Sequence, residues 1–199
     1  MWMVGLVLAS TLGFGLWGAP SLNEPQTILM DFSQSAEVEL WRSIDDRVMG
    51  GISESRMTSS GQGSAIFSGT VSLENNGGFA SVRSATKKRD WSGFAWIVLR
   101  VRGDGKTYSI NLKTDPNFDG ITYRSNFTTK RDEWTTVVLP MDGFRAVFRG
   151  RPVPQAGKID WKEIQSVGFL ISGRQEGEFR LEVESIQGRR PGAKEPALP

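Results

Sequence analysis

Apolar side chains recur at every second position along much of this sequence from Ile28 onward. The segments 107–113 and 178–184 show the alternation most clearly. A period of two places successive side chains on opposite faces of an extended chain, so it predicts β-strands with one buried face and one wet face. The segment 94–99 is apolar throughout, which is typical of a strand covered on both sides.

Many short strands separated by turns are predicted. Further strands are expected at 28–32, 37–44, 52–57, 64–73, 79–84, 121–127, 134–139 and 166–171. Clusters of Gly, Asn, Asp and Pro between them favour tight turns. Only 160–165 favours a helical turn, with Asp160 as the N-cap and Glu163 completing a capping box. Together these signals predict an all-β fold, an antiparallel β-sandwich with jelly-roll connectivity.

The predicted sandwich spans residues 26–188, which is long enough for one well-buried core. Large aromatic side chains are expected to dominate that core. The candidates are Trp41, Phe67, Phe79, Trp96, Phe127, Trp134, Phe169 and Phe179. The tail 189–199 is rich in Arg, Pro, Gly and Lys and is expected to be disordered.

The first 19 residues form an uncharged, apolar leader. We expect it to act as an export signal or as a membrane anchor, and we expect contact with a membrane only through it. The alternative is an apolar helix packed on the domain, although glycines at positions 5, 13, 15 and 18 weaken a helix.

The sequence contains no cysteine and no histidine, which excludes several kinds of chemistry. Disulfides, thiolate and imidazole metal sites, and Ser-His-Asp or Cys-His catalysis are all ruled out. The 24 basic and 22 acidic residues give a net charge of +2 with no long block of one sign, so nucleic-acid binding is not expected. No cofactor, metal site or catalytic residue is identified, and we predict a non-enzymatic protein.

Two segments, 45–53 and 75–83, place paired glycines directly before an extended run. Glycine there allows positive φ or close approach of another chain segment. Neither segment fits a phosphate-binding loop, because a strand and not a helix is expected to follow.

Adjacent carboxylates at Asp45 and Asp46 could bind a cation or act as acid and base. On an extended chain they point to opposite faces, so we expect them not to converge on one ion or bond. A structural interpretation has one carboxylate accepting hydrogen bonds from the glycine turn and the other pairing with Arg47 or Arg83. The alternative is an interaction surface, in which Arg83 pairs with Asp45 or Asp46 and joins the two glycine segments.

These two segments, together with 134–140 and 177–186, resemble the complex I intermediate-associated protein family. The resemblance covers roughly residues 28–186. It implies a galactose-binding-like β-sandwich, related in shape to carbohydrate-binding modules and not known for catalysis. It also implies a role in assembling respiratory complex I, with a protein partner such as a membrane or respiratory complex subunit.

Two surfaces are candidates for that contact, the glycine segments and the segment 141–151. The second carries three Arg and two Phe, and exposed Arg and aromatic residues are favoured at interfaces. Its alternative is a crossover that Phe144 and Phe148 anchor to the core. The candidate contact residues are Asp45, Asp46, Arg47, Met49, Gly50, Gly51, Ser53, Asn76, Gly78, Arg83, Phe144, Arg145, Arg149 and Arg151.

A polar face on two predicted strands supports a different function, the binding of a glycan. Amides and charged groups on such a face can bond sugar hydroxyls, although an ordinary wet face has the same composition. The candidate ligand-binding residues are Ser109, Asn111, Lys113, Arg124 and Asn126, with Thr122 beside them.

Overall fold

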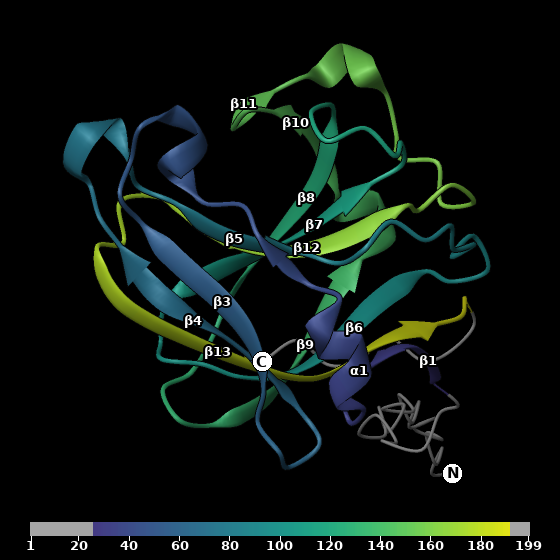
Figure 1. The fold of residues 1–199 in the computed structure, drawn as a ribbon. Coiled ribbons are helices and arrows are strands. Elements are labelled where there is room, and N and C mark those ends of the chain that lie inside the picture. Colours follow the sequence, from purple (N-terminus) through teal and green to yellow (C-terminus); the bar gives the residue numbers. More distant parts are fainter. Residues whose placement is uncertain (1–25, 192–199) are drawn as a thin grey trace, which may run out of the picture.

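Two antiparallel β-sheets make up most of residues 26–191, the part of the chain that the computed structural model describes (Figure 1). They pack face to face as a sandwich, as the sequence predicts. The predicted leader at 1–19 and the tail beyond residue 191 lie outside the described residues. Within residues 26–191, no helix is long and apolar enough to cross a membrane.

The first sheet has six strands in the order β3-β4-β13-β6-β9, with β1 paired to β13. They are β1 (Thr27–Asp31), β3 (Glu54–Ser59), β4 (Ala65–Val71), β6 (Trp96–Arg102), β9 (Trp134–Pro140) and β13 (Gly177–Arg189). The long β13 lies at the centre and pairs with β4, β6 and β1.

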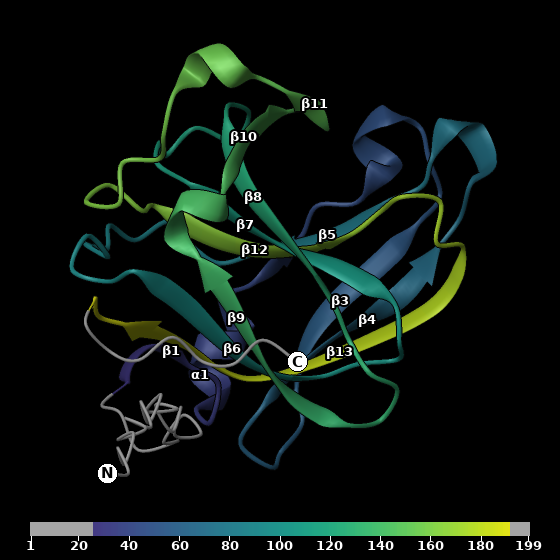
Figure 2. The same ribbon diagram turned by 180° about the vertical axis from the view of Figure 1, so that it is seen from behind.

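The second sheet has seven strands in the order β11-β10-β8-β7-β12-β5-β2. They are β2 (Arg42–Ser43), β5 (Ala80–Arg83), β7 (Thr107–Lys113), β8 (Thr122–Thr128), β10 (Arg145–Phe148), β11 (Arg151–Pro152) and β12 (Ser166–Ile171). Figure 2 shows β8, β7, β12 and β5 side by side across this sheet.

Short helical pieces connect the strands. They are α1 (Ser35–Glu39), η1 (Asp46–Met49), η2 (Glu74–Asn76), η3 (Met141–Gly143) and η4 (Pro154–Ala156). The chain crosses between the sheets repeatedly, from β4 to β5, β5 to β6, β6 to β7, β8 to β9 and β9 to β10. This repeated crossing is what the predicted jelly-roll connectivity requires.

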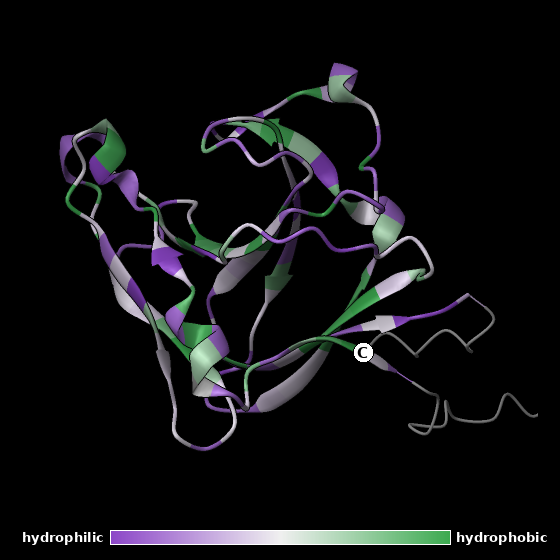
Figure 3. Cartoon of the chain, turned by 45° about the vertical axis from the view of Figure 1, so that its right-hand side comes forward, coloured by the Kyte–Doolittle hydropathy of each residue, from purple (hydrophilic) through white to green (hydrophobic). Residues whose placement is uncertain are grey.

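The core forms between the sheets from the inward half of each alternating strand, and the alternation of hydropathy is visible along the ribbons (Figure 3). Among the predicted aromatic core residues, Trp41, Phe67, Phe127, Phe169 and Phe179 are buried. Phe79, Trp96 and Trp134 are only half-buried, so their assignment to the core is wrong. Trp134 lies on the outer face of β9, beneath the guanidinium groups of Arg100 and Arg102.

The predicted strand at 37–44 is wrong over most of its length. Residues 35–39 form helix α1, and only Arg42–Ser43 is strand. Val38 and Trp41, three residues apart, are the side chains buried here, and that spacing suits a helical turn.

Three further differences concern segment boundaries. Residues 160–165 form a turn in which Asp160 Oδ1 accepts from the Lys162 N–H at 3.0 Å, as predicted for an N-cap, but no helix follows. The Glu163 carboxylate pairs with Lys88 Nζ at 2.6 Å and does not complete a capping box. The segment 141–151, expected as a loop, contributes β10 and part of β11. Strand β13 extends to Arg189, a buried residue that the sequence assigned to the tail.

Candidate functional site

The Asp46 carboxylate joins the two glycine segments. It is fully buried at the start of η1. Its Oδ1 accepts a hydrogen bond from the Ser53 N–H at 2.9 Å. Its Oδ2 accepts from the Ser53 hydroxyl at 2.6 Å and from the N–H groups of Gly78 at 2.7 Å and Phe79 at 3.3 Å. Four donors from two distant segments therefore fix this turn.

The Asp45 carboxylate makes a second, separate set of contacts. It accepts from the N–H and the hydroxyl of Ser55, at 2.8 and 2.6 Å, and from the Ser81 N–H at 2.9 Å. Asp45 and Asp46 thus do not converge on one partner, as their adjacency predicts. Both act as structural ties between β3 and the segment around β5.

The predicted ion pairs of these carboxylates with arginine are wrong. Arg47 pairs with Glu54 on β3, and the Arg83 guanidinium donates to the Phe118 carbonyl oxygen at 3.0 Å. The two glycine segments do lie together, but backbone N–H groups and serines make the connection, and not the predicted pairing with Arg83. A carboxylate can accept hydrogen bonds directly from N–H and O–H groups, so these two carboxylates need no arginine partner.

Two glycines allow the backbone to approach the Asp46 side chain closely. A Cβ at Gly51 would lie 2.3 Å from Asp46 Oδ1, and a Cβ at Gly77 would lie 2.7 Å from Oδ2. Any other residue at either position would force the carboxylate away from its donors. The glycines are therefore part of the tie and are not available as contact residues.

Hydrogen bonding sets the ionisation of Asp46. Burial alone raises the pKa of this carboxyl, but the hydrogen bonds from Ser53, Gly78 and Phe79 outweigh burial and hold the pKa below its ordinary value.

A pKa lowered in the folded state makes stability depend on pH. We expect the Asp46 contribution to be complete above the unfolded value of about 3.9 and to be lost as the pH falls through the folded pKa. Urea unfolding of the wild type and an Asp46→Asn variant should therefore differ most near neutral pH, and the difference should shrink below about pH 4. A constant difference down to about pH 2 would contradict this account.

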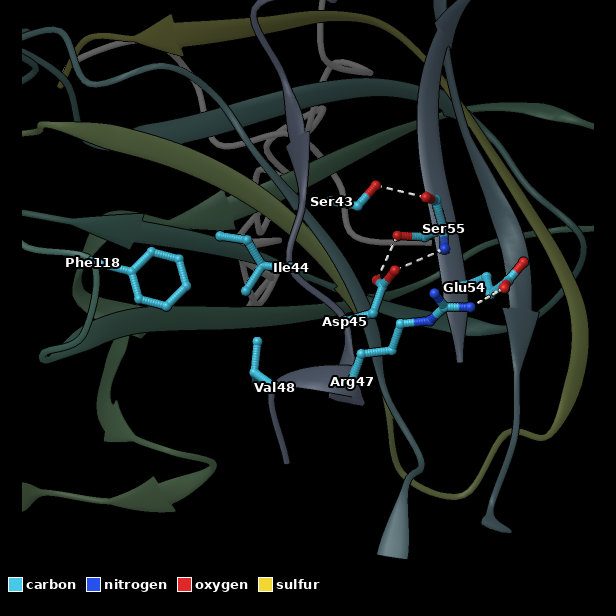
Figure 4. A pocket seen from close by; sticks show the side chains of 8 residues that line it. All are labelled: Ser43, Ile44, Asp45, Arg47, Val48, Glu54, Ser55 and Phe118. Atoms are coloured by element: carbon cyan, nitrogen blue, oxygen red, sulfur yellow. Dashed lines mark hydrogen bonds and ion pairs between the residues drawn. The ribbon is translucent and has the colours of Figure 1, made fainter. Parts of the chain in front are cut away.

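The η1 turn presents apolar side chains to solvent from this fixed base. Val48 is 63% exposed and Met49 is 59% exposed. Phe118, in the loop between β7 and β8, is 66% exposed. Figure 4 shows Val48, Ile44 and Phe118 around one hollow.

We call this hollow the Phe118 pocket. It has a volume of about 480 Å³ and is lined by Ser43, Ile44, Asp45, Arg47, Val48, Glu54, Ser55 and Phe118. A second hollow of about 460 Å³ shares Ser43, Ile44 and Phe118 with it and extends to Arg83 and Ser166. The two hollows therefore adjoin at these three residues.

The loop 114–121 connects this region with the second predicted surface. The Arg83 guanidinium lies 5.6 Å from the centre of the Phe118 ring. One residue further along, Asp119 forms an ion pair with Arg149 at 2.5 Å. The loop thus spans from β5 to the turn between β10 and β11.

The predicted contact residues in 141–151 divide into two groups. Phe144 is buried and packs edge-on against Trp161, with ring centres 5.3 Å apart, so it anchors the segment and is not a contact residue. Arg145, Arg149 and Arg151 are exposed. Phe148 is 38% exposed and lies beneath the Arg149 guanidinium, so it is available at the surface.

The structure brings the predicted polar face together. The Ser109 hydroxyl donates to Asn126 Oδ1 at 2.7 Å, and Arg124 Nε donates to Asn111 Oδ1 at 2.9 Å. Lys113, on the same face of β7, is buried. In Figure 1 the η1 turn and strands β10 and β11 rise at opposite ends of this sheet on the same side.

Among the predicted residues, Arg47 and Met49 are exposed beside the pocket, whereas Asp45, Asp46, Gly51 and Ser53 are buried. Asn76 is exposed in η2 with a left-handed backbone, Gly50 is exposed directly after η1, and the Gly78 N–H donates to Asp46. Val48 and Phe118 are not among the contact residues predicted from the sequence. Phe118 follows a predicted polar turn, and an aromatic residue in such a turn was the available signal.

No cluster of three or more acidic side chains capable of holding a metal ion occurs within residues 26–191.

The two-sheet architecture defines a β-sandwich of the kind found in carbohydrate-binding modules. The family 11 module of the cellulase Lic26A-Cel5E of Clostridium thermocellum superposes with a TM-score of 0.63 at 19% identity, covering 83% of this chain and 95% of the module. An agarase, AgWH50C, superposes with a TM-score of 0.55 at 16% identity, covering 84% of this chain and 25% of the agarase. At these identities the likeness establishes the fold alone.

The chain belongs to the Complex I intermediate-associated protein 30 (CIA30) family, whose model matches residues 30–183. The mitochondrial complex I intermediate-associated protein 30 of Mus musculus is 28% identical over 186 residues, covering 82% of this chain and 56% of that protein. An uncharacterized protein of Schizosaccharomyces pombe is 31% identical over 169 residues, covering 74% of this chain and 76% of that protein. The chain spans about half the length of the first animal relatives it matches.

Proposed function

We propose that this protein is a non-enzymatic binding domain that holds a protein partner during the assembly of respiratory complex I. Membership of the CIA30 family supports this assignment, since the named relatives are complex I intermediate-associated proteins. The docking site we assign is the Phe118 pocket with the exposed side chains of η1 beside it.

The observation that carries the proposal is a rigid turn displaying solvated apolar groups. Val48, Met49 and Phe118 are each more than half exposed, while Asp46, at the start of the turn that carries Val48 and Met49, is fully buried and accepts four hydrogen bonds. Phenylalanine and methionine are enriched at protein interfaces. A preordered turn loses little conformational entropy on binding, which favours affinity.

Charged side chains border this apolar site. Arg47 lies at one edge of the pocket, and Arg149 and Arg151 lie beyond the loop that carries Phe118. An apolar centre with a polar rim is the usual arrangement of a protein–protein interface.

Replacing Val48 and Phe118 together with serine is expected to weaken partner capture at least about tenfold, because both would lose apolar contact area at the centre of the interface. The matched control is Ile28→Ser, which removes an apolar side chain of similar exposure, 59%, from β1 on the other sheet. The measurement is mild crosslinking of the tagged full chain in cells, followed by quantification of captured complex I subunits. All variants should unfold within about 1 kcal/mol of the wild type, because the replaced side chains are exposed.

Two results would contradict the proposal. One is capture that contains no respiratory complex I subunit. The other is equal capture by the double variant and the wild type, which would move the docking site away from η1 and Phe118.

Glycan binding on the polar face is the second candidate function. The observation that favours it is the ordered set of side-chain hydrogen bonds between β7 and β8, from Ser109 to Asn126 and from Arg124 to Asn111. Calorimetric titration with neutral β-glucan oligosaccharides separates the two candidates. Saturable binding that Asn111→Ala abolishes would favour the glycan.

A further inference from the structure

A row of cationic residues crosses the outer face of the second sheet. In the strand register, each of the following residues is paired with the next: Arg42, Arg83, Gly168, Asn111, Arg124 and Arg145. Side chains at paired positions project from the same face of a sheet. The neighbouring core residues Val82, Leu112 and Tyr123 occupy the opposite face, so the row faces away from the core.

Lys113 adds a buried cation to this face. Its side chain is 3% exposed, and within residues 26–191 its Nζ finds no hydrogen-bond acceptor. An ion pair with Asp115 Oδ2 at 3.4 Å, longer than a normal charge-assisted hydrogen bond, partly offsets the charge. A buried ammonium without hydrogen bonds is costly. The cost is explained if the charge serves to attract an anion.

Arg124 is a second cation without an acidic partner among the described residues. Its Nε donates to the neutral amide of Asn111, and no ion pair of its guanidinium occurs within residues 26–191. Gly168 lies between Arg83 and Asn111 in this row and contributes no side chain between the two.

The loop 114–121 places one carboxylate against Lys113 and another against Arg149, in the turn after β10. Asp115 pairs with Lys113, and Asp119 pairs with Arg149. Asp115 and Asp119 are fewer than the arginines of the row together with Lys113 and Arg149. The net charge of this face is therefore positive.

We propose that this face, around Arg83, Lys113 and Arg124, binds an acidic peptide segment of the protein partner. The proposal rests on the proposed function, and it assigns the chemistry of the partner. Arg83 and Arg124 lie three strands apart, roughly 14 Å, which matches carboxylates about four residues apart on an extended peptide. The second hollow is lined by Arg83, Ser166 and Phe118. The proposed site for the acidic peptide is therefore continuous with the apolar docking site.

A peptide is favoured over a sugar by the side chains of this face. The outward positions of β5, β12, β7 and β8 carry Ser, Arg, Gly, Leu, Asn, Lys and Thr, and none of them carries an aromatic ring on which a pyranose could stack. The exposed Phe118 ring beside this face has the Arg83 guanidinium 5.6 Å from its centre. Guanidinium groups instead provide two parallel donors that suit carboxylates.

The test uses a fluorescein-labelled peptide of five Glu-Gly repeats and its Gln-Gly counterpart, titrated against the full chain by fluorescence anisotropy. We expect saturable binding of the Glu peptide that weakens as salt is raised, and no binding of the Gln peptide. Arg124→Gln should weaken binding at least about tenfold. Arg56→Gln, an exposed arginine on β3 of the other sheet, is the matched control and should leave binding unchanged.

Lys113→Met separates a ligand-binding role from a structural one. The variant keeps the length of the side chain and removes the buried charge. We expect it to weaken binding of the Glu peptide at least about tenfold while raising Tm by about 2–4 °C. A lower Tm with unchanged affinity would overturn the proposal, because Lys113 would then be structural.

Competition identifies the class of ligand. Inorganic phosphate and an oligogalacturonate are added in separate titrations. Saturable binding of either one, without binding of the Glu peptide, would overturn the peptide assignment.

The acidic-peptide site and the assembly function can fail separately. If the Glu peptide binds as described but no complex I subunit is captured, the acidic-peptide site stands and the assembly function fails. If capture of complex I subunits depends on Val48 and Phe118 but the Glu peptide does not bind, the acidic-peptide site is wrong and the assembly function stands.

Discussion

Replacing Asp46 with asparagine is expected to lower the free energy of unfolding by about 3–5 kcal/mol. Asparagine has nearly the same shape, but its amide turns one oxygen acceptor into a donor. In one orientation that donor faces the Ser53 N–H, and in the other it faces the N–H groups of Gly78 and Phe79. The site is fully buried, so water cannot satisfy the displaced groups.

The loss is large for a domain of this size. It corresponds to a fall in Tm of roughly 6–20 °C. Urea unfolding near neutral pH measures it directly. The control is Glu54→Gln, which removes a carboxylate from the exposed ion pair with Arg47 and should cost less than about 1 kcal/mol. Equal losses in the two variants would contradict the prediction, because the four buried hydrogen bonds of Asp46 would then add nothing beyond the loss of a negative charge.

This prediction separates two roles within one short segment. Asp45, Asp46 and Ser53 are buried and hold the turn, whereas Arg47, Val48 and Met49 are exposed and free to contact a partner. A change at the buried positions should therefore reduce binding by disordering the turn. A change at Val48 should reduce binding without loss of stability.

The fold was largely predictable from the period-two pattern because side chains in a sandwich alternate between core and solvent. The segment 37–44 shows the limit of that pattern. Glu37, Val38, Glu39 and Leu40 alternate as in a strand, yet they lie in or directly after a helix that buries Val38 and leaves Leu40 50% exposed. Short segments satisfy both periods, and here the structure buries Val38 and Trp41 together in the core.

The candidate site was only partly predictable. The glycine segments were predicted to form one surface joined by Arg83, but the acceptors of their N–H groups depend on how β3 and β5 are placed, which spacing does not reveal. Arg83 could pair with any nearby acceptor, and the loop that supplies the Phe118 carbonyl lies 35 residues further along the chain. The polar face was found because its residues alternate along two strands whose register then aligned them.

Replacing Gly51 with alanine is expected to lower the free energy of unfolding by about 3–4 kcal/mol, whereas Gly50→Ala should cost only about 1–2 kcal/mol. The added Cβ at Gly51 would lie 2.3 Å from Asp46 Oδ1, and four hydrogen bonds keep that carboxylate from moving aside. Gly50 has a positive φ of 91° but no atom within 4 Å of a Cβ, so its alanine variant bears only backbone strain.

Urea unfolding of both glycine variants, alone and combined with Asp46→Asn, tests this difference. Gly51→Ala and Asp46→Asn disturb the same contact, so their combined loss should be smaller than the sum of the two single losses by at least about 1 kcal/mol. Gly50→Ala should add to Asp46→Asn within about 0.5 kcal/mol, because it has no contact with the carboxylate. Additive losses for Gly51→Ala would show that the glycine serves the turn for a reason other than the approach of Asp46.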